Sequence, residues 1–309
     1  MATQKVVGAN DGPRITVAAM VKNPTVIPAR VISATEQMFI VDSLLRKLPP
    51  TDSGMVQYDE STPLFADGNA EIVEEFGEIP TIGGRLGARK VAFTVKRALA
   101  ILVSQEMVNR NNIDRVNKQI KQVANTMIRT WETTFFQAIL NHPDVLTYNA
   151  AFDWGLATGK IRFDLTEAGL LIENAAPADD LDNYYGFQPD TLVVGKRTKA
   201  DLITSDDFNK VFRNSPTLSE KSPEYKGTLV SDYYGLRILV SRELDRLAPN
   251  KALLLESKTL GGISDERPMR ATPLYPDRPR ETWRSDTVRQ SAVVIDQPKA
   301  ACWINGVGT

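Results

Sequence analysis

Histidine and cysteine are nearly absent from this chain of 309 residues, which has one of each. The lone Cys302 excludes an intramolecular disulfide. Together with His142 it also falls short of the three or four ligands of these types that the usual zinc sites need. His142 precedes Pro143 at the end of a helical pattern, where it is expected to stop the helix. The sequence therefore predicts no metal, no cofactor and no enzymatic activity.

Net charge and long apolar runs are also lacking. Lys and Arg number 37 against 38 Asp and Glu, a net charge of −1, so the molecule as a whole is not built to attract nucleic acid or an anionic membrane. No apolar run approaches the roughly 20 residues that a membrane-spanning helix requires. Residues 1–14 carry no hydrophobic signal region, so secretion through a cleaved signal peptide is not expected.

Motifs for phosphate or dinucleotide binding are incomplete. Residues 155–160 resemble a phosphate-binding loop, but they are one residue short and Ile161 stands where a Ser or Thr is required. The glycines at 83, 84 and 87 do not join a buried strand to a helix, as a dinucleotide site demands. A soluble α/β enzyme stays open as a competing class, although no catalytic set of side chains supports it.

The N-terminal fifty residues have the pattern of an arm. Residues 1–14 are polar and indicate a mobile tail. In residues 15–28 apolar patches are broken by Pro24 and Pro28, which predicts that this stretch is not helical. Residues 34–48 have apolar positions at helical spacing and predict a short helix.

Residues 66–97 predict a long hairpin with a glycine-rich tip. Strands are expected at 71–75 and 90–96, with acidic residues on the outgoing arm and basic residues on the returning arm. The candidate contact residues are Glu71, Glu74, Glu75, Arg85, Arg89 and Lys90. Their charges either pair across the two strands of one chain or contact a neighbouring subunit. The tip is too poor in apolar residues to form a core of its own, which favours a neighbour.

The strongest pattern is a helix over residues 113–140. Apolar residues recur every three or four positions along it, as in a helix that buries one face. Asn112 is expected to cap its start, and Asp114 suits the first turn. At ~1.5 Å per residue the helix is on the order of 40 Å long, which predicts a spine against which a sheet packs.

The rest of the sequence predicts a mixed α/β region at residues 150–245, followed by strands. Helices are expected at 164–174 and at 198–203, the second capped by Thr198, and a buried strand at 191–194. Further strands are expected at 235–240, 252–256, 268–274, 280–288 and 291–295.

The order of these features resembles the HK97-like major capsid proteins of tailed bacteriophages. The hairpin, the link at 95–96 and 102–108, and the long helix are similar to the extended loop and spine helix of that family. Residues 189–194 are similar to its axial domain. Trp283, Arg284 and residues 287–301 are similar to its closing strands. The resemblance covers roughly residues 15–307.

This resemblance implies an α+β fold of four parts. They are an N-terminal arm at 1–50, an extended β-hairpin loop at 51–97, a peripheral domain with the spine helix at 98–144 and 246–309, and an axial α/β domain at 145–245. It also implies a subunit that forms hexamers and pentamers of an icosahedral shell around double-stranded DNA bound without sequence specificity. Further implied partners are a portal and separate scaffolding and decoration proteins.

The implied location is the virion, after assembly in the cytoplasm of a bacterial host, with no membrane partner. An encapsulin, the shell of a cellular compartment, is the competing member of the same fold. Some family members join a Lys of the extended loop covalently to a neighbouring Asn. Lys90 stands in roughly that position, and an ordinary salt-bridging role is its alternative.

Overall fold

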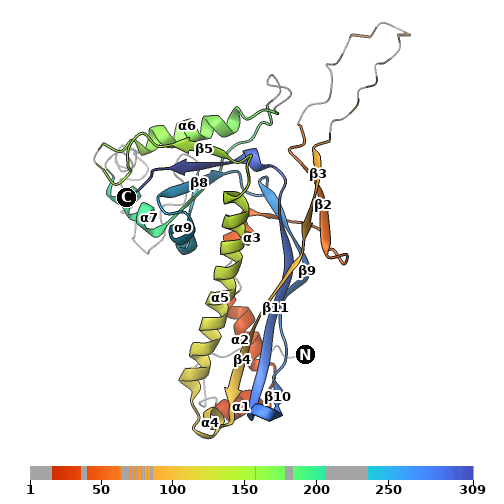
Figure 1. Ribbon diagram of the computed structural model, residues 1–309, viewed down its shortest axis with the longest axis vertical. Coiled ribbons are helices and arrows are strands. Elements are labelled where there is room, and N and C mark those ends of the chain that lie inside the picture. The colour runs from red at the N-terminus through yellow and green to blue at the C-terminus, as the bar shows by residue number, and fades with distance from the viewer. Residues whose placement is uncertain are drawn as a thin grey trace, which may run out of the picture.

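A computed structural model describes residues 16–35, 40–63, 70, 72–73, 76–77, 79, 81, 83, 86–156, 158–177, 184–205 and 236–308. Within these residues the strands form two five-stranded sheets and a two-stranded hairpin. The long helix α5 (Ile113–Leu140) runs beside one sheet and ends beneath the other, and the hairpin is a separate pair of strands that lies beside the first sheet, in contact with β11 (Figure 1).

Helix α5 begins and ends where the sequence predicts. Its buried stripe includes Val116, Met127, Trp131 and Phe135, as the spacing of apolar residues requires. Asp114 lies in the first turn. Asn112 takes the N-cap position as predicted, but its side chain makes no capping hydrogen bond.

The first sheet flanks this helix and is built around one long strand, β11 (Thr282–Ile295). The sheet has the order β1-β9-β11-β10, and β4 (Val95–Ser104) also pairs with β11. Ten antiparallel residue pairs join β4 to β11, from Ser291↔Val95 to Thr282↔Ser104. The two strands expected at 280–288 and 291–295 are therefore one continuous strand, irregular only in its pairing with β9 near Gln290. The other members are β1 (Arg46–Lys47), β9 (Gly261–Ala271) and β10 (Tyr275–Asp277).

The N-terminal segment is helical where the sequence predicted no helix. Helix α1 spans Val17–Lys22 and α2 spans Val26–Thr35. Pro24 falls between the helices, and Pro28 is the third residue of α2, where a backbone N–H has no partner within the helix, so neither proline breaks one. Both helices pack on the core formed by β4 and the first half of α5.

Two further short helices complete this part of the molecule. The helix expected at 34–48 is shorter, since α3 covers Ile40–Leu44 and β1 follows it. Helix α4 (Gln105–Asn109) connects β4 to α5.

The second sheet lies across the far end of α5, with the order β5-β12-β8-β6-β7 (Figure 1). Its side chains alternate between two apolar clusters, as the period of two along a strand requires. Leu192 and Leu254 face the side of helix α6 (Ile161–Glu173), and Val193 and Leu253 face the end of α5. The strands are β5 (Leu146–Asn149), β6 (Thr191–Val194), β7 (Arg237–Val240), β8 (Lys251–Leu255) and β12 (Ala301–Asn305).

Two helices follow the parallel strands of this sheet. Helix α7 (Lys196–Thr204) follows β6 and α9 (Arg242–Leu247) follows β7. Thr198 does not cap α7 as predicted, because the helix begins earlier and Gly195 takes the cap position. Strands β8 and β12 come after residue 245, so this sheet is not confined to residues 145–245.

In the part of the chain that the structure describes, no helix is both long enough and apolar enough to cross a membrane.

Candidate assembly site at the base of the hairpin

The hairpin consists of β2 (Met55–Glu60) and β3 (Ala88–Phe93), paired antiparallel from Met55↔Phe93 to Glu60↔Ala88. The strand that pairs with the returning arm is thus 55–60, earlier than the expected 71–75. Gly87 fits because the backbone is crowded there: a Cβ at this position would lie 1.9 Å from the Glu60 carbonyl oxygen. The predicted contact residues Glu71, Glu74, Glu75 and Arg85 lie outside the described residues.

The other two predicted contact residues pair within their own chain. The Arg89 Nε lies 3.6 Å from Asp59 Oδ1, directly across the hairpin. The Lys90 Nζ lies 2.5 Å from Glu60 Oε2. This bond raises the pKa of the Lys90 ammonium above its ordinary value. Cross-strand pairing, one of the two alternatives that the sequence leaves open, therefore holds for Arg89 and Lys90.

The Glu60 carboxylate joins the hairpin to the end of the spine helix. Its residue is 4% exposed, and its Oε2 lies 3.4 Å from His142 Nε2. Ligand-type atoms of Glu60, His142 and Asp144 all lie within 4.8 Å of one another. These are donor types that bind transition-metal ions, but the Lys90 ammonium already neutralises Glu60. Lys90 and Glu60 form an ion pair within the hairpin, and the Glu60–His142 contact connects this network to the turn after α5.

Sequence reasoning missed this network. His142 was interpreted only as a helix stop, and Glu60 was not singled out. No local signal connects the two residues, since they come from strand β2 and the turn after α5 and meet only in the folded chain. The one signal in the sequence that could have pointed to this contact is that His142 is the single histidine of the chain.

We expect Glu60→Gln to destabilise the subunit by about 1–2 kcal/mol. The neutral amide leaves the Lys90 ammonium and the half-buried His142 without their carboxylate, and the lost bond is charge-assisted. Urea unfolding of the unassembled subunit, followed by circular dichroism, measures this loss. Asp59→Asn is the matched control, because its pair with Arg89 is long and exposed and should cost at most about 0.5 kcal/mol. Equal losses in both variants would contradict the role of Glu60.

Backbone contacts also fix the end of β2. The Ser61 N–H donates a 2.8 Å hydrogen bond to the Asp296 carbonyl oxygen, just beyond β11. The Tyr185 hydroxyl donates a 3.4 Å bond to the Ser61 carbonyl oxygen. Arg46 forms an ion pair with the Asp296 side chain. The hairpin therefore leaves the body from a fixed point.

Part of the outer face of the hairpin is apolar, at Met55, Val91 and Phe93, next to the polar Gln57 and the Asp59–Arg89 pair. Side chains alternate across the two strands, and Val56, Tyr58 and Ala92 on one face are partly covered. On the opposite face Phe93 is 69% exposed and Val91 is 43% exposed. An isolated two-stranded hairpin has no second layer to cover such a face, and contiguous exposed apolar groups mark interaction surfaces.

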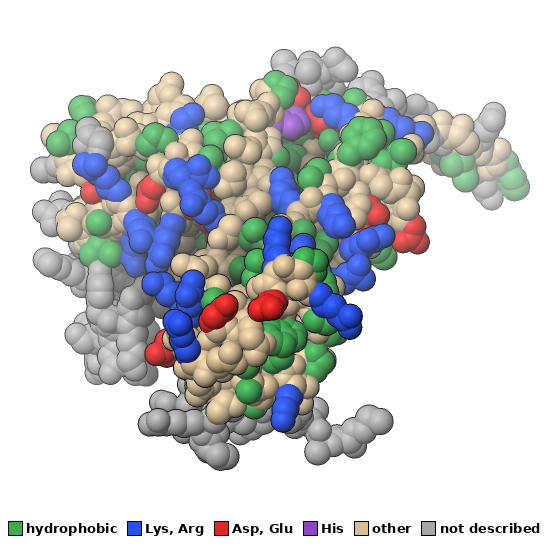
Figure 2. Space-filling view, turned by 60° about the horizontal axis from the view of Figure 1, so that its bottom comes forward, with side chains coloured by type: hydrophobic (Ala, Val, Ile, Leu, Met, Phe, Trp, Pro, Cys, Tyr) green, Lys and Arg blue, Asp and Glu red, His purple; other side chains and the backbone are tan. Residues whose placement is uncertain are grey.

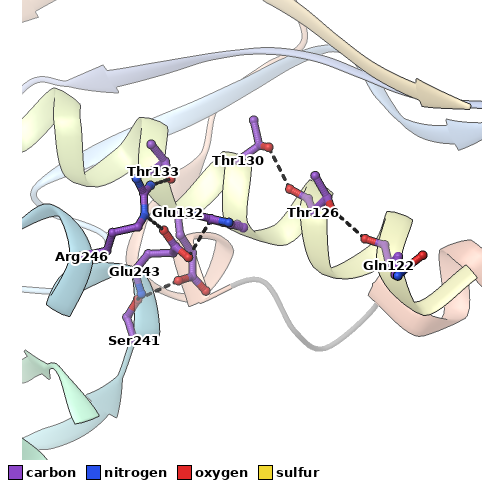
Figure 3. Close-up of polar contacts among 9 residues, drawn as sticks. Gln122, Thr126, Thr130, Glu132, Thr133, Ser241, Glu243 and Arg246 are labelled. Atoms are coloured by element: carbon purple, nitrogen blue, oxygen red, sulfur yellow. Dashed lines mark hydrogen bonds and ion pairs between the residues drawn. The ribbon is translucent and has the colours of Figure 1, made fainter. Parts of the chain in front are cut away.

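A second polar cluster connects the spine helix to the second sheet (Figure 3). The Ser241 hydroxyl, at the end of β7, donates a 2.6 Å hydrogen bond to Glu132 Oε2 in the interior. Beside it, Arg129 of α5 lies 3.0 Å from Glu243 of α9. The Arg246 guanidinium donates to Glu243 at 2.6 Å and to the Thr133 hydroxyl at 3.0 Å. These bonds set the position of α9 against α5.

Burial raises the pKa of the Glu132 carboxyl, and the Ser241 bond offsets this only in part. A carboxyl whose pKa is raised on folding binds a proton more readily in the folded state. Its contribution to stability is therefore complete below its ordinary pKa of 4.5. That contribution is lost as the pH rises through the pKa of the folded state. We expect Glu132→Gln, which keeps an acceptor for Ser241, to be more stable than the wild type at pH 7. The two proteins should converge near pH 4. Urea unfolding at both pH values measures the difference, and a variant that is less stable at pH 7 would contradict the expectation.

The chain matches a known protein family over most of its length. A family model described as phage capsid protein matches residues 88–304, which is more than half of the chain. The chain belongs to this family. A search of curated protein sequences gave no significant match.

Solved structures of low sequence identity share the fold of this capsid protein. A virus-like particle from Pyrococcus furiosus matches with a TM-score of 0.58 and 12% identity, over 90% of this chain and 97% of that one. A structure from Microbacterium phage Oxtober96 matches with a TM-score of 0.56 and 13% identity, over 86% and 90%. The capsid of Myoviridae phage XM1 matches with a TM-score of 0.50 and 8% identity, over 87% and 92%.

These likenesses confirm the predicted fold. The capsid protein has the HK97-like α+β fold, with an arm, a hairpin, a spine helix and an α/β sheet, and its family is one of structural capsid proteins. The apolar hairpin face and the Glu60 network are therefore features of a subunit whose relatives assemble from many copies.

Proposed function

We propose that this capsid protein assembles as hexamers and pentamers into an icosahedral shell that encloses the double-stranded DNA of a tailed phage. The observation that carries the proposal is a hairpin with a fixed ion pair at its base, on whose outer face the apolar side chains Val91 and Phe93 stay exposed. Such a face is stabilised when a second copy covers it, and repeated contacts of this kind close a shell.

We add two side chains of the hairpin to the contact residues that the sequence indicated. Arg89 and Lys90 are engaged by Asp59 and Glu60 of their own chain. We infer that Val91 and Phe93, which point away from the body, contact the neighbouring subunit. Glu71, Glu74, Glu75 and Arg85 stay candidates for contacts farther along the loop.

The four-part division carries over to the proposal with one change. The axial domain takes in β8 and β12 besides residues 145–245, because these strands complete its sheet. The arm at 1–50, the extended loop at 51–97 and the spine at 98–144 keep their bounds. A portal, scaffolding and decoration proteins are the further partners, in a virion assembled in the bacterial cytoplasm.

A cellular compartment shell of the encapsulin type is the second candidate. The likeness to the virus-like particle from Pyrococcus furiosus, over nearly the whole of both chains, favours it. The two functions differ in content, because a phage shell holds double-stranded DNA and a compartment shell holds a cargo protein.

Negative-stain electron microscopy of the protein, expressed alone and with its neighbouring genes, tests the proposal. Closed shells or capsomer rings are the expected result, and nuclease-protected DNA inside them separates the phage from the compartment. A small soluble oligomer in both samples would overturn the shell function.

A further inference from the structure

Basic side chains gather on one face of the molecule, formed by helices α5, α7 and α9. These three helices carry nine Lys and Arg residues against five Asp and Glu residues, a net charge of +4, in a chain whose total is −1. Helix α9 packs against both α5 and α7, so the three are continuous. Figure 2 shows Lys and Arg side chains concentrated on the face turned toward the viewer.

Along α5 the basic residues follow one side of the helix. Arg115, Lys118 and Arg129 lie within about 60° of one another around the axis, at 100° per residue, and Lys121 lies beside them. All four are exposed. From Arg115 to Trp131 the helix has no acidic residue. This row runs for about 21 Å, at 1.5 Å per residue.

The acidic residues of the face are mostly engaged. Glu132 is buried against Ser241. Glu243 is shared by two arginines, so that pairing leaves a net positive charge. The Asp245 carboxylate accepts a 2.8 Å hydrogen bond from the Lys196 backbone N–H. Between the basic residues, the exposed Thr126 donates its hydroxyl to a carbonyl of its own helix. The electrostatic potential at the surface of this face is therefore positive.

We infer that this face binds the phosphate backbone of double-stranded DNA without reading its sequence. The inference rests on the proposed function, in which the shell encloses DNA. A duplex carries a phosphate charge every 1.7 Å or so along its axis, and a row of cations neutralises those phosphates while releasing counterions. The face offers exposed Lys and Arg, and contacts of such side chains with phosphates carry no sequence information.

The test uses the full-length unassembled subunit and a fluorescently labelled 30-base-pair duplex. Anisotropy titrations between 50 and 200 mM salt give the binding constant and its salt dependence. In the triple variant Arg115→Gln, Lys118→Gln, Lys121→Gln, we expect the slope of log K against log salt to shrink in magnitude by about 2–3, and binding at 100 mM salt to weaken at least about tenfold. A duplex of unrelated sequence should behave identically.

The matched control removes three positive charges elsewhere: Lys47→Gln, Arg278→Gln, Arg280→Gln, all exposed and all outside the three helices. It should change the slope by less than 1, and circular dichroism melting should show both triples folded. No duplex binding by the wild type, equal losses in the two triples, or equal binding of an acidic peptide of the same charge would overturn the inference. Normal shells from a protein that does not bind the duplex would overturn this inference and leave the proposed function intact. Duplex binding without shells would support the inference and overturn the proposed function.

Discussion

Trp131→Ala is expected to reduce the free energy of unfolding by about 3–5 kcal/mol, the cost of removing a large aromatic from a packed core. Trp131 is 1% exposed in the middle of α5. Its ring is contacted by the Arg97 guanidinium of β4, 5.0 Å from the centroid, and by the Arg289 guanidinium of β11 at 4.9 Å. These cation–π contacts add up to about 2 kcal/mol where they are desolvated. The loss is large beside a typical stability of about 5–15 kcal/mol.

The loss is large because the Trp131 ring covers the buried ion pairs of Arg289. The Arg289 side chain is nearly buried, and it donates hydrogen bonds to Asp265 at 2.9 Å and to Asp42 at 3.3 Å. Without the indole, water reaches these ion pairs and α5 loses a buried contact with β4 and β11. Trp131→Phe is the control, because it keeps an aromatic face and should lose about half as much. Urea unfolding followed by circular dichroism measures both, and a loss below about 1.5 kcal/mol for the alanine variant would contradict the spine role.

Local periodicity accounts for the parts of the fold that could be predicted. Helix α5 was predicted to the residue, because its apolar stripe repeats over many turns and ends at His142-Pro143. Strand β6 was predicted because a threonine and three apolar residues stand between turn signals. The helical arm was missed because a proline in the first turn of a helix costs little, and composition alone does not give its position in the turn.

Non-local pairing accounts for the rest. The partner of β3 was placed at 71–75 because acidic residues there complement the basic arm, whereas the carboxylates that meet Arg89 and Lys90 belong to Asp59 and Glu60. Strand β8 pairs with β6, and β12 pairs with β8, across long stretches of sequence. Register between distant strands depends on side chains that are adjacent only in the folded state, and charge patterning along the chain does not specify it.

Val91→Ser combined with Phe93→Ser is expected to block shell assembly while leaving the subunit folded. Both side chains lie on the outer face of β3, and neither belongs to an apolar cluster of its own chain. Burying such a side chain against a neighbour contributes about 1.5–3 kcal/mol. Both side chains are already partly covered in the free subunit, so removing the two should weaken each intersubunit contact by about 2–4 kcal/mol, which raises the concentration needed for assembly by about 30- to 1,000-fold.

Replacing the apolar side chains with serine tests this contact more cleanly than reversing a charge on the same strand. An acidic side chain at position 90 would repel the buried Glu60 carboxylate and damage the hairpin base, so that loss of shells would not identify an interface. The matched control is Val91→Ile with Phe93→Leu, which keeps the face apolar and should assemble normally. Sedimentation separates shells from free subunits, and melting curves report folding. Normal shells from the serine pair would place the hairpin contact elsewhere, whereas shells from the control pair alone would show that the apolar face of β3 is buried between subunits.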